Sequence, residues 1–232
     1  MSSARSRTLR ETVRDNGLGL VFGALLLLAL LGQAFTGQAE INSRADTLGL
    51  AHVSFWEYVT SSNFTVDVAE NWQSEYLQFL LYILLTVWLV QRGSPESKKV
   101  GASGRGSDRE QKVGRYAEED SPKWAKAGGW RTRIFSHSLV LVMGLVFLGS
   151  WLAQLVAGRS AYNSQQLSNL EDPVSLGGYL MAPDFWNRTL QNWQSELLAV
   201  GSMAVLSVYL RERGSPESKP VGAPHDETAV EG

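Results

Sequence analysis

The sequence predicts an all-α membrane protein with four transmembrane helices, arranged as two tandem parallel-repeat helical hairpins with short interfacial helices in the outer loops. Three observations lead to this fold class: two apolar runs of membrane-crossing length, a sequence repeat with a constant offset of 121 residues, and a one-sided distribution of lysine and arginine.

Two apolar runs are long enough to cross a membrane. Residues 17–35 and 138–157 are almost entirely apolar, and each contains one glutamine, Gln33 or Gln154. About 20 such residues span the hydrocarbon core of a bilayer as a helix. Shorter apolar runs at 76–90 and 197–210 are expected to complete two further spans together with the polar residues just before them.

The repeat consists of two blocks that each occur twice at the same offset. Asn-Trp-Gln-Ser-Glu occupies residues 71–75 and 192–196, and Arg-Gly-Ser-Pro-Glu-Ser-Lys occupies residues 92–98 and 213–219. We interpret this as an internal duplication that aligns residues 10–101 with residues 131–222 without a gap. The first apolar run resembles a cleavable signal peptide, but its counterpart in the second half is internal, so a retained span is the preferred interpretation.

Lysine and arginine set the orientation. The chain has 21 lysine and arginine residues, and 18 of them lie on one predicted side: before the first span, in the central linker or after the last span. The four before the first span are Arg5, Arg7, Arg10 and Arg14. The opposite side carries Arg44, Arg159 and Arg188. Because the basic side is normally cytoplasmic, both termini and the linker are predicted to face inward.

The predicted organisation follows from these spans. Repeat 1 covers residues 1–101, with spans at about 17–36 and 72–91, and repeat 2 covers residues 131–222, with spans at about 138–157 and 193–211. Residues 102–130 are predicted to be a flexible cytoplasmic linker and residues 223–232 a disordered tail, because both are rich in Gly, Ser or charge. Short helices are expected after Ser54 in the first outer loop, and the second helix of each unit should begin about ten residues before Asn-Trp-Gln-Ser-Glu.

Polar side chains near the outer end of the predicted spans form a candidate intramembrane layer. A 20-residue window that ends at Gln91 begins at Trp72, so the second span of repeat 1 contains Glu75, and the same reasoning applies to Glu196. An ionisable side chain at membrane depth is a functional hypothesis by default. The candidate layer comprises Gln33, Asn71, Glu75, Gln154, Asn192 and Glu196.

A candidate polar track continues from this layer toward the cytoplasm in repeat 1 only. Gln78, Tyr82 and Thr86 share the helical face of Glu75. Their counterparts in repeat 2 are largely apolar, so a symmetric proton wire is not expected, whereas a one-sided path stays open. The competing interpretation is structural: the glutamates and glutamines form hydrogen bonds between helices and clamp the bundle.

Composition limits the chemistry. The chain has no cysteine, which excludes disulfides and thiolate metal sites, and its three histidines are scattered. No nucleophile or phosphate-binding loop accompanies the acidic residues. We therefore expect no enzymatic activity, no metal and no cofactor, and the net charge of −2 gives no indication of nucleic-acid binding.

The segments DVAENWQSEYLQF (67–79) and WNRTLQNWQSELLAVGSMA (186–204), together with the repeated blocks, resemble an uncharacterised family of duplicated bacterial membrane proteins known only as a domain of unknown function. The resemblance covers nearly the full length. It implies a bacterial inner-membrane location, and it provides no catalytic or binding residues to transfer.

Three functions of different classes are consistent with these observations. The first is an integral plasma-membrane protein that organises partners, with membrane lipid, another membrane protein or a second copy of the chain as its partner. The alternative is a small proton- or cation-conducting transporter or channel that uses the Glu75 and Glu196 layer. A membrane enzyme built on the same carboxylates ranks last, since nothing accompanies them that would serve as a nucleophile.

Overall fold

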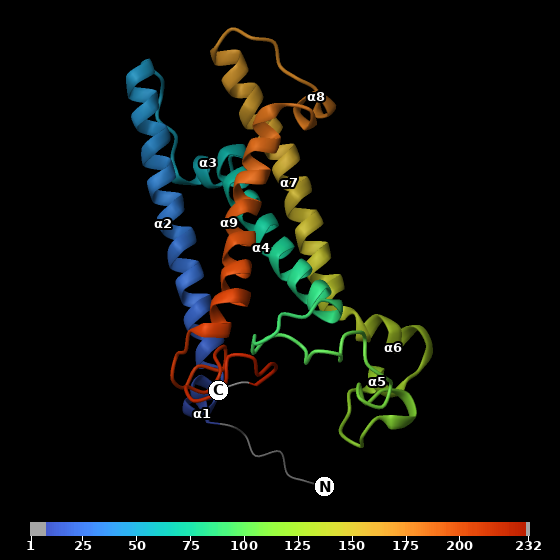
Figure 1. Cartoon of the computed structure of the whole chain (residues 1–232). Helices are drawn as coiled ribbons and strands as arrows, with labels where there is room; N and C mark the ends of the chain where they lie inside the picture. The colour runs from blue at the N-terminus through green and yellow to red at the C-terminus, as the bar shows by residue number, and fades with distance from the viewer. Residues whose placement is uncertain (1–7, 231–232) are drawn as a thin grey trace. The chain divides into compact units, whose positions relative to one another are not determined.

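The structure, a computed structural model, describes residues 8–230, and over that range it is helical without strands (Figure 1). Arg5 and Arg7 of the basic N-terminal flank, and the last two residues of the predicted tail, lie outside the described residues. The chain divides into two compact units between Thr65 and Val66, a point inside one long helix.

The first unit contains α1 (Leu9–Asp15), α2 (Gly17–Leu48), α3 (Phe55–Val59) and the beginning of α4 (Ser62–Trp88). α3 begins where the sequence predicts a cap: the Ser54 hydroxyl accepts a hydrogen bond from the Glu57 amide, and the Glu57 carboxylate accepts one from the Ser54 amide. These hydrogen bonds hold the pKa of Glu57 below its usual value. The capping box therefore fixes the start of α3 at Phe55.

Two contacts hold α3 and its preceding loop against α2. The Asn42 side chain donates to the Val53 carbonyl over 3.1 Å and accepts from the Val53 amide over 2.8 Å. Tyr58 is 3 % exposed and packs on Gly37, where a β-carbon would come 2.0 Å from the phenolic oxygen. Because only glycine leaves this space, Gly37 permits the close approach of Tyr58.

The second unit contains the rest of α4, the 3₁₀ turn η1 (Gly114–Tyr116), α5 (Lys123–Lys126), α6 (Gly129–Ser136), α7 (Ser138–Ser168), α8 (Leu176–Leu180) and α9 (Pro183–Tyr209). The contacts just described recur in it at an offset of 121 residues. Asn163 holds Val174 through hydrogen bonds of 3.0 and 2.8 Å, and a β-carbon at Gly158 would come 2.6 Å from the Tyr179 oxygen.

The two long helices that are polar in their first half and apolar in their second half, α4 and α9, begin where the sequence predicts. α4 begins at Ser62 and α9 at Pro183, each nine residues before its Asn-Trp-Gln-Ser-Glu block, so this prediction is confirmed. Proline at the first helical turn suits α9 because its missing amide hydrogen would have no partner there.

Only two of the four predicted spans are long and apolar enough to cross a membrane, among the residues that the structure describes. These are α2 and α7, whose most apolar windows have mean hydropathies of 2.3 and 2.2. The four-span prediction is therefore borne out for two helices only. α4 and α9 fall short because the first half of each helix is polar, which leaves too few apolar residues after Glu75 and Glu196.

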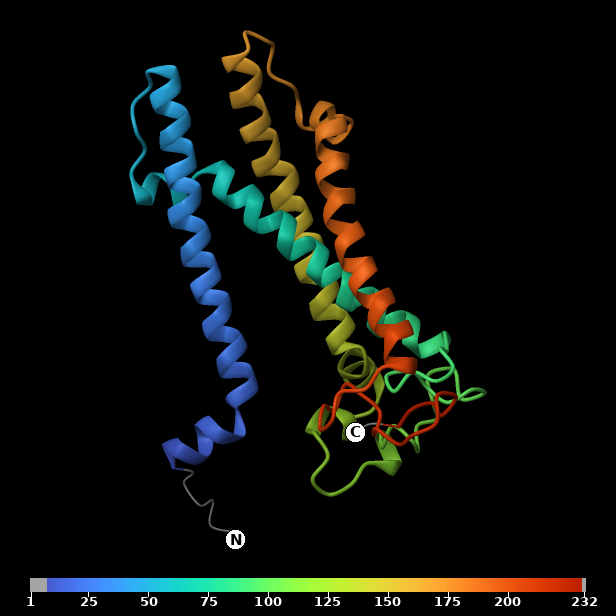
Figure 2. The same cartoon turned by 60° about the vertical axis from the view of Figure 1, so that its left-hand side comes forward.

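In the second unit α4 crosses α7 and α9 obliquely, as both cartoon views show (Figures 1 and 2). Leu80 of α4 lies against Gly144 of α7: a β-carbon added to Gly144 would lie 3.8 Å from a methyl carbon of Leu80. α7 and α9 are joined by aromatic packing, in which the Trp151 ring lies 6.0 Å from Phe185 and 6.5 Å from Trp193. These three helices position most of the side chains of the candidate site.

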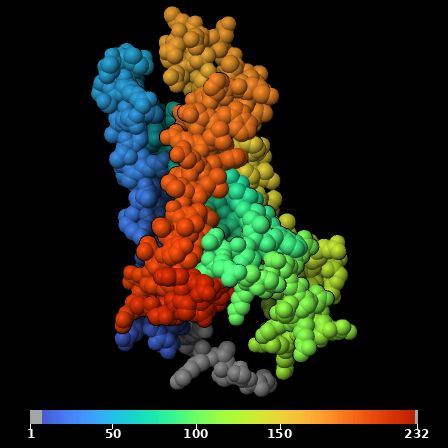
Figure 3. Space-filling view, in the orientation of Figure 1, coloured from blue at the N-terminus to red at the C-terminus, as the bar shows by residue number. Residues whose placement is uncertain are grey.

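The segments predicted to be flexible contain ordered contacts. The linker region holds η1, α5 and the start of α6. The tail folds back at the end of α9 (Figure 3): the buried Lys219 ammonium donates to the carbonyls of Pro224, His225 and Glu227, and the Gly93 amide donates to Thr228 over 2.9 Å. The composition of this short segment alone does not predict that one lysine would donate to three of its backbone carbonyls.

Candidate functional site

The two Asn-Trp-Gln-Ser-Glu blocks meet where α4 crosses α9. The indole nitrogen of Trp193 donates to the Gln73 side-chain oxygen over 2.8 Å, and Gln73 is fully buried. The reciprocal contact does not form, because Trp72 is 41 % exposed. The repeated pentapeptide therefore contributes a hydrogen bond between helices, formed by a glutamine from one copy and a tryptophan from the other.

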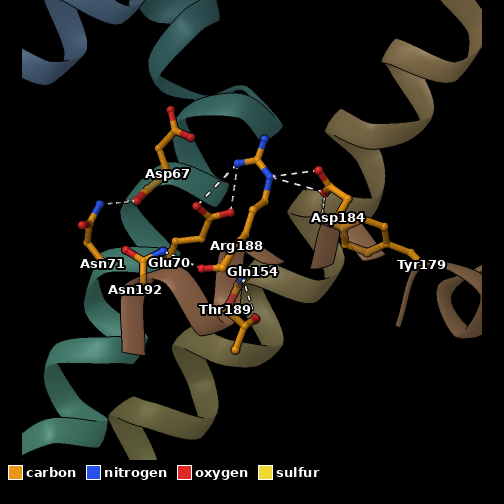
Figure 4. Close-up of polar contacts among 9 residues, drawn as sticks. All are labelled: Asp67, Glu70, Asn71, Gln154, Tyr179, Asp184, Arg188, Thr189 and Asn192. Carbon is orange, nitrogen blue, oxygen red and sulfur yellow. Dashed lines mark hydrogen bonds and ion pairs between the residues drawn. The ribbon is translucent and has the colours of Figure 1, made fainter. Parts of the chain in front are cut away.

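Nearer the beginning of both helices, an ion pair joins the same two helices (Figure 4). Arg188 of α9 donates to the Glu70 carboxylate of α4 over 3.1 Å and also pairs with Asp184 of its own helix over 3.3 Å. The Glu70 side chain is 10 % exposed and that of Arg188 is 41 % exposed. Arg188 thus neutralises a buried carboxylate that would otherwise carry a large desolvation cost.

A tyrosine and a glutamine extend this cluster (Figure 4). The fully buried Tyr179 donates its hydroxyl to Asp184 over 3.0 Å, and burial raises the pKa of Tyr179, so the phenol stays protonated as a donor. Gln154 of α7, also fully buried, donates to Thr189 of α9 over 3.2 Å. All three long helices of the second unit are therefore linked by side-chain hydrogen bonds, each of which involves at least one buried side chain.

The predicted polar layer is only partly assembled by these contacts. Gln154 is buried as described, whereas Gln33 lies half-buried on α2 in the first unit. Asn71 and Asn192 donate back into their own helices, to the carbonyls of Asp67 and Arg188, both over 2.8 Å. The hydrogen bonds of these two asparagines therefore satisfy local backbone groups of their own helices.

Glu75 and Glu196 are brought near one another. Glu75 is exposed and Glu196 half-buried, and their carboxylates lie close enough for their charges to interact. The interaction is repulsive when both are ionised. Whether the candidate layer binds an ion or a proton stays a prediction.

The candidate polar track lines one hollow of the second unit. Gln78, Tyr82 and Thr86 border a space of about 460 Å³ between α4 and α9, whose opposite wall is formed by Leu197, Val200 and Ala204. The Gln78 side-chain oxygen is buried and has no hydrogen-bond partner among the described residues. The track is one-sided, as the sequence indicates, with polar groups from α4 facing apolar groups from α9.

At the end of this hollow where Glu96 lies, the second repeated block provides another pair of carboxyl groups. The Tyr82 hydroxyl donates to Glu96, and a hydrogen bond with Glu96 raises the pKa of Glu217. Glu96 and Glu217 hold the same place in the two Arg-Gly-Ser-Pro-Glu-Ser-Lys blocks. The neighbouring Glu96 carboxyl group therefore favours the protonated form of Glu217.

Sequence reasoning missed Glu70, Gln73, Arg188 and Thr189 as contact residues. A signal was present, because Val66, Ala69, Glu70 and Gln73 follow the helical spacing of a buried face. The adjacent face, through Asn71 and Glu75, also has helical spacing and continues as a polar track. Arg188 was also one of only three basic residues on the predicted outer side.

No three His, Asp or Glu side chains between residues 8 and 230 are grouped in a way that would hold a metal ion. No characterised protein and no solved structure is detectably similar to the chain. One family model does match: residues 9–230 fit a domain of unknown function (DUF6766) over almost the whole length, and the chain therefore belongs to that family.

Proposed function

We propose that the protein is an integral membrane protein of the bacterial plasma membrane, with a structural or organising role and no enzymatic activity. In this proposal α2 and α7 each cross the bilayer, and the apolar second halves of α4 and α9 provide two further spans. The result is two tandem hairpins with both termini cytoplasmic.

The exposed surface of α2 and α7 carries this proposal. Only 6 % of the most apolar window of each helix is buried inside the protein, and large side chains such as Leu27 and Leu145 are 63 % and 70 % exposed. Apolar surface of this extent is stable in lipid and not in water. Helices also satisfy their own backbone groups, as a lipid environment demands.

The organising role is supported by how the buried polar groups are used. Gln73 and Gln154 are fully buried, and each forms a hydrogen bond to another helix, while Glu70 is neutralised by Arg188. Interhelical hydrogen bonds between such groups fix membrane helices relative to one another. Surfaces remain for partners in the outer loops, where Trp56 is 74 % and Met181 79 % exposed.

Two measurements test this proposal: the membrane topology of reporter fusions, and the capture of a partner from native membranes. Reporter fusions at residues 60 and 181 should report the outside and a fusion at residue 115 the inside. After mild cross-linking in native membranes, the protein should purify with a stoichiometric partner, and exchange of the loops 49–61 and 170–182 for unrelated sequence should remove that partner. Fusions at 60 and 115 on one side would refute the topology. A protein that purifies alone would refute the organising role.

A second candidate function, proton or cation conduction, is favoured by one specific arrangement. Gln78, Tyr82 and Thr86 line the same hollow, and Tyr82 donates to Glu96 at its inner end. The interacting carboxylates Glu75 and Glu196 precede this track on the outer side. Polar groups in series with carboxyl groups at both ends are what a proton relay requires.

Measurements of proton flux test whether the protein conducts protons. In proteoliposomes with an imposed proton gradient, the parent protein should dissipate the gradient, and Glu75→Gln combined with Glu196→Gln should abolish that flux. Tyr82→Phe should reduce it, whereas Glu119→Gln, at an exposed linker carboxylate, should leave it unchanged. If the parent protein shows no flux, or if the double variant shows full flux, the proposal of conduction through this layer is refuted.

A further inference from the structure

The segment just before α7 concentrates positive charge. α5 and α6 carry Lys123, Lys126, Arg131 and Arg133, and no aspartate or glutamate occurs between residues 121 and 170. All four basic side chains are exposed. This short stretch therefore presents a cationic surface immediately beside one of the two helices able to cross a membrane.

The same segment exposes large apolar side chains. Trp124, Trp130, Ile134 and Phe135 are between 40 % and 64 % exposed. The rings of Trp124 and Trp130 meet edge to face at 6.1 Å, and the Thr132 hydroxyl donates to the Trp124 carbonyl over 2.8 Å. These contacts join α5 to α6 while leaving their aromatic surface uncovered.

Charge and apolar surface are ordered around α6. Because an α-helix turns about 100° per residue, Trp130 and Ile134 form one stripe, with Arg131 on one side and Arg133 on the other. The Arg131 guanidinium lies 5.5 Å from the centre of the Trp130 ring. An apolar stripe flanked by arginines is the pattern of a helix that lies in a membrane interface, with its cations extended toward the headgroups.

The backbone turns α6 away from α7 at a single residue. His137 separates the two helices with φ −119° and ψ 9°, so α6 leaves the end of α7 at an angle (Figure 1). In the first unit Asn16 separates α1 from α2 with φ −119° and ψ 17°. The exposed stripe Leu9 and Val13 on α1 corresponds to Trp130 and Ile134 at the 121-residue offset.

We propose that α5 and α6 lie on the inner surface of the membrane and bind anionic phospholipid headgroups. Trp130 and Ile134 enter the level of the first acyl carbons, and Arg131 and Arg133 reach the phosphates. Anionic phospholipid is the ligand that charge complementarity favours, because a cationic surface at the inner leaflet meets negatively charged lipid. The inference rests on the proposed function, in that α7 must span the bilayer to bring α6 to its surface.

Spin labels at single cysteines test this directly, because the chain has no cysteine of its own. The labelled positions are Ile134→Cys in α6, Leu145→Cys in α7 and Gln111→Cys in the linker. The protein is reconstituted into vesicles of phosphatidylcholine alone or mixed with phosphatidylglycerol. Accessibility to oxygen indicates lipid, and accessibility to a water-soluble nickel complex indicates water.

In the anionic vesicles the label at 134 should be shielded from nickel and exposed to oxygen, and the label at 111 should stay in water. Arg131→Gln with Arg133→Gln should lower the bound-to-free ratio of the label at 134 by about 30-fold, the value for two basic residues at an anionic surface. Arg105→Gln with Arg109→Gln removes the same charge from the linker and should change nothing.

Each outcome separates the two proposals. A label at 134 that stays in water in anionic vesicles, while the label at 145 is in lipid, overturns the headgroup site and leaves the membrane proposal standing. Equal lipid exposure at 134 with and without phosphatidylglycerol also overturns the anionic site. A label at 145 that is open to nickel overturns the proposed function itself.

Discussion

Replacement of Arg188 by alanine is expected to destabilise the second unit by about 2–3 kcal/mol, because Glu70 would keep its buried position and lose its cationic partner. Removal of one member of a fully buried pair costs more, and the smaller value here reflects the 41 % exposure of the Arg188 side chain. Asp184 would lose its cationic partner in the same variant and keep its hydrogen bond from Tyr179. Thermal unfolding in detergent should show a decrease in Tm of about 5–10 °C.

A double-mutant cycle shows whether the pair or the arginine alone matters. Glu70→Gln removes the buried charge, so Arg188→Ala in the Glu70→Gln background should cost clearly less than in the parent. Arg213→Ala, which removes an exposed arginine after α9, should leave the Tm unchanged. Equal costs of Arg188→Ala in both backgrounds would contradict an ion pair that joins the helices.

Substitution of valine for Gly158 is expected to cost about 3 kcal/mol, at the upper end of what overpacking a well-filled site usually causes. A β-carbon there would lie 2.6 Å from the Tyr179 oxygen and 3.0 Å from a ring carbon, and Tyr179 is fully buried. The ring must move, which breaks its 3.0 Å hydrogen bond to Asp184. The measurement is the midpoint of unfolding followed by loss of helical circular dichroism.

The same helix offers a matched control for this substitution. Gly149→Val introduces the same side chain on α7 at a place where a β-carbon meets no atom within 4 Å, so its effect on the midpoint should be small. Tyr179→Phe added to Gly158→Val removes the closest atom and should recover part of the loss. If the two glycine variants unfold alike, the Tyr179 contact does not determine the stability of α7 with α8.

Local structure was predictable because its causes are local. Ser54 and Glu57 are three residues apart, and their capping box requires no knowledge of the rest of the chain. Pro183 marks the start of α9 for the same reason. The two apolar helices were also predictable, since length and composition are properties of one segment.

Contacts between helices were not predictable in the same way. The face of α4 that turns toward α9 depends on the angle at which the helices cross, and periodicity does not give that angle. Both the face with Glu70 and Gln73 and the face with Asn71 and Glu75 have helical spacing. The structure buries the first face, and the second passes from exposed Glu75 to the hollow beside Gln78.

The contacts of the tail were not predictable for a related reason. Its composition lacks the apolar residues that drive burial, so disorder was the natural expectation. Its contacts are made instead by backbone carbonyls, which surround the Lys219 ammonium, and by Thr228, which accepts from Gly93. Backbone acceptors are common to every sequence, and their arrangement becomes visible only once the chain has folded.

The ion pair between Glu70 and Arg188 makes the two halves of the chain complementary and no longer interchangeable. At the offset of 121 residues Arg188 corresponds to Asp67, and Thr189 corresponds to Val68. A tandem of two first halves would set an aspartate opposite Glu70, and two like charges would replace the attraction. Residues 131–222 therefore supply a side chain that residues 10–101 lack, and two copies of the first segment could not reproduce this junction.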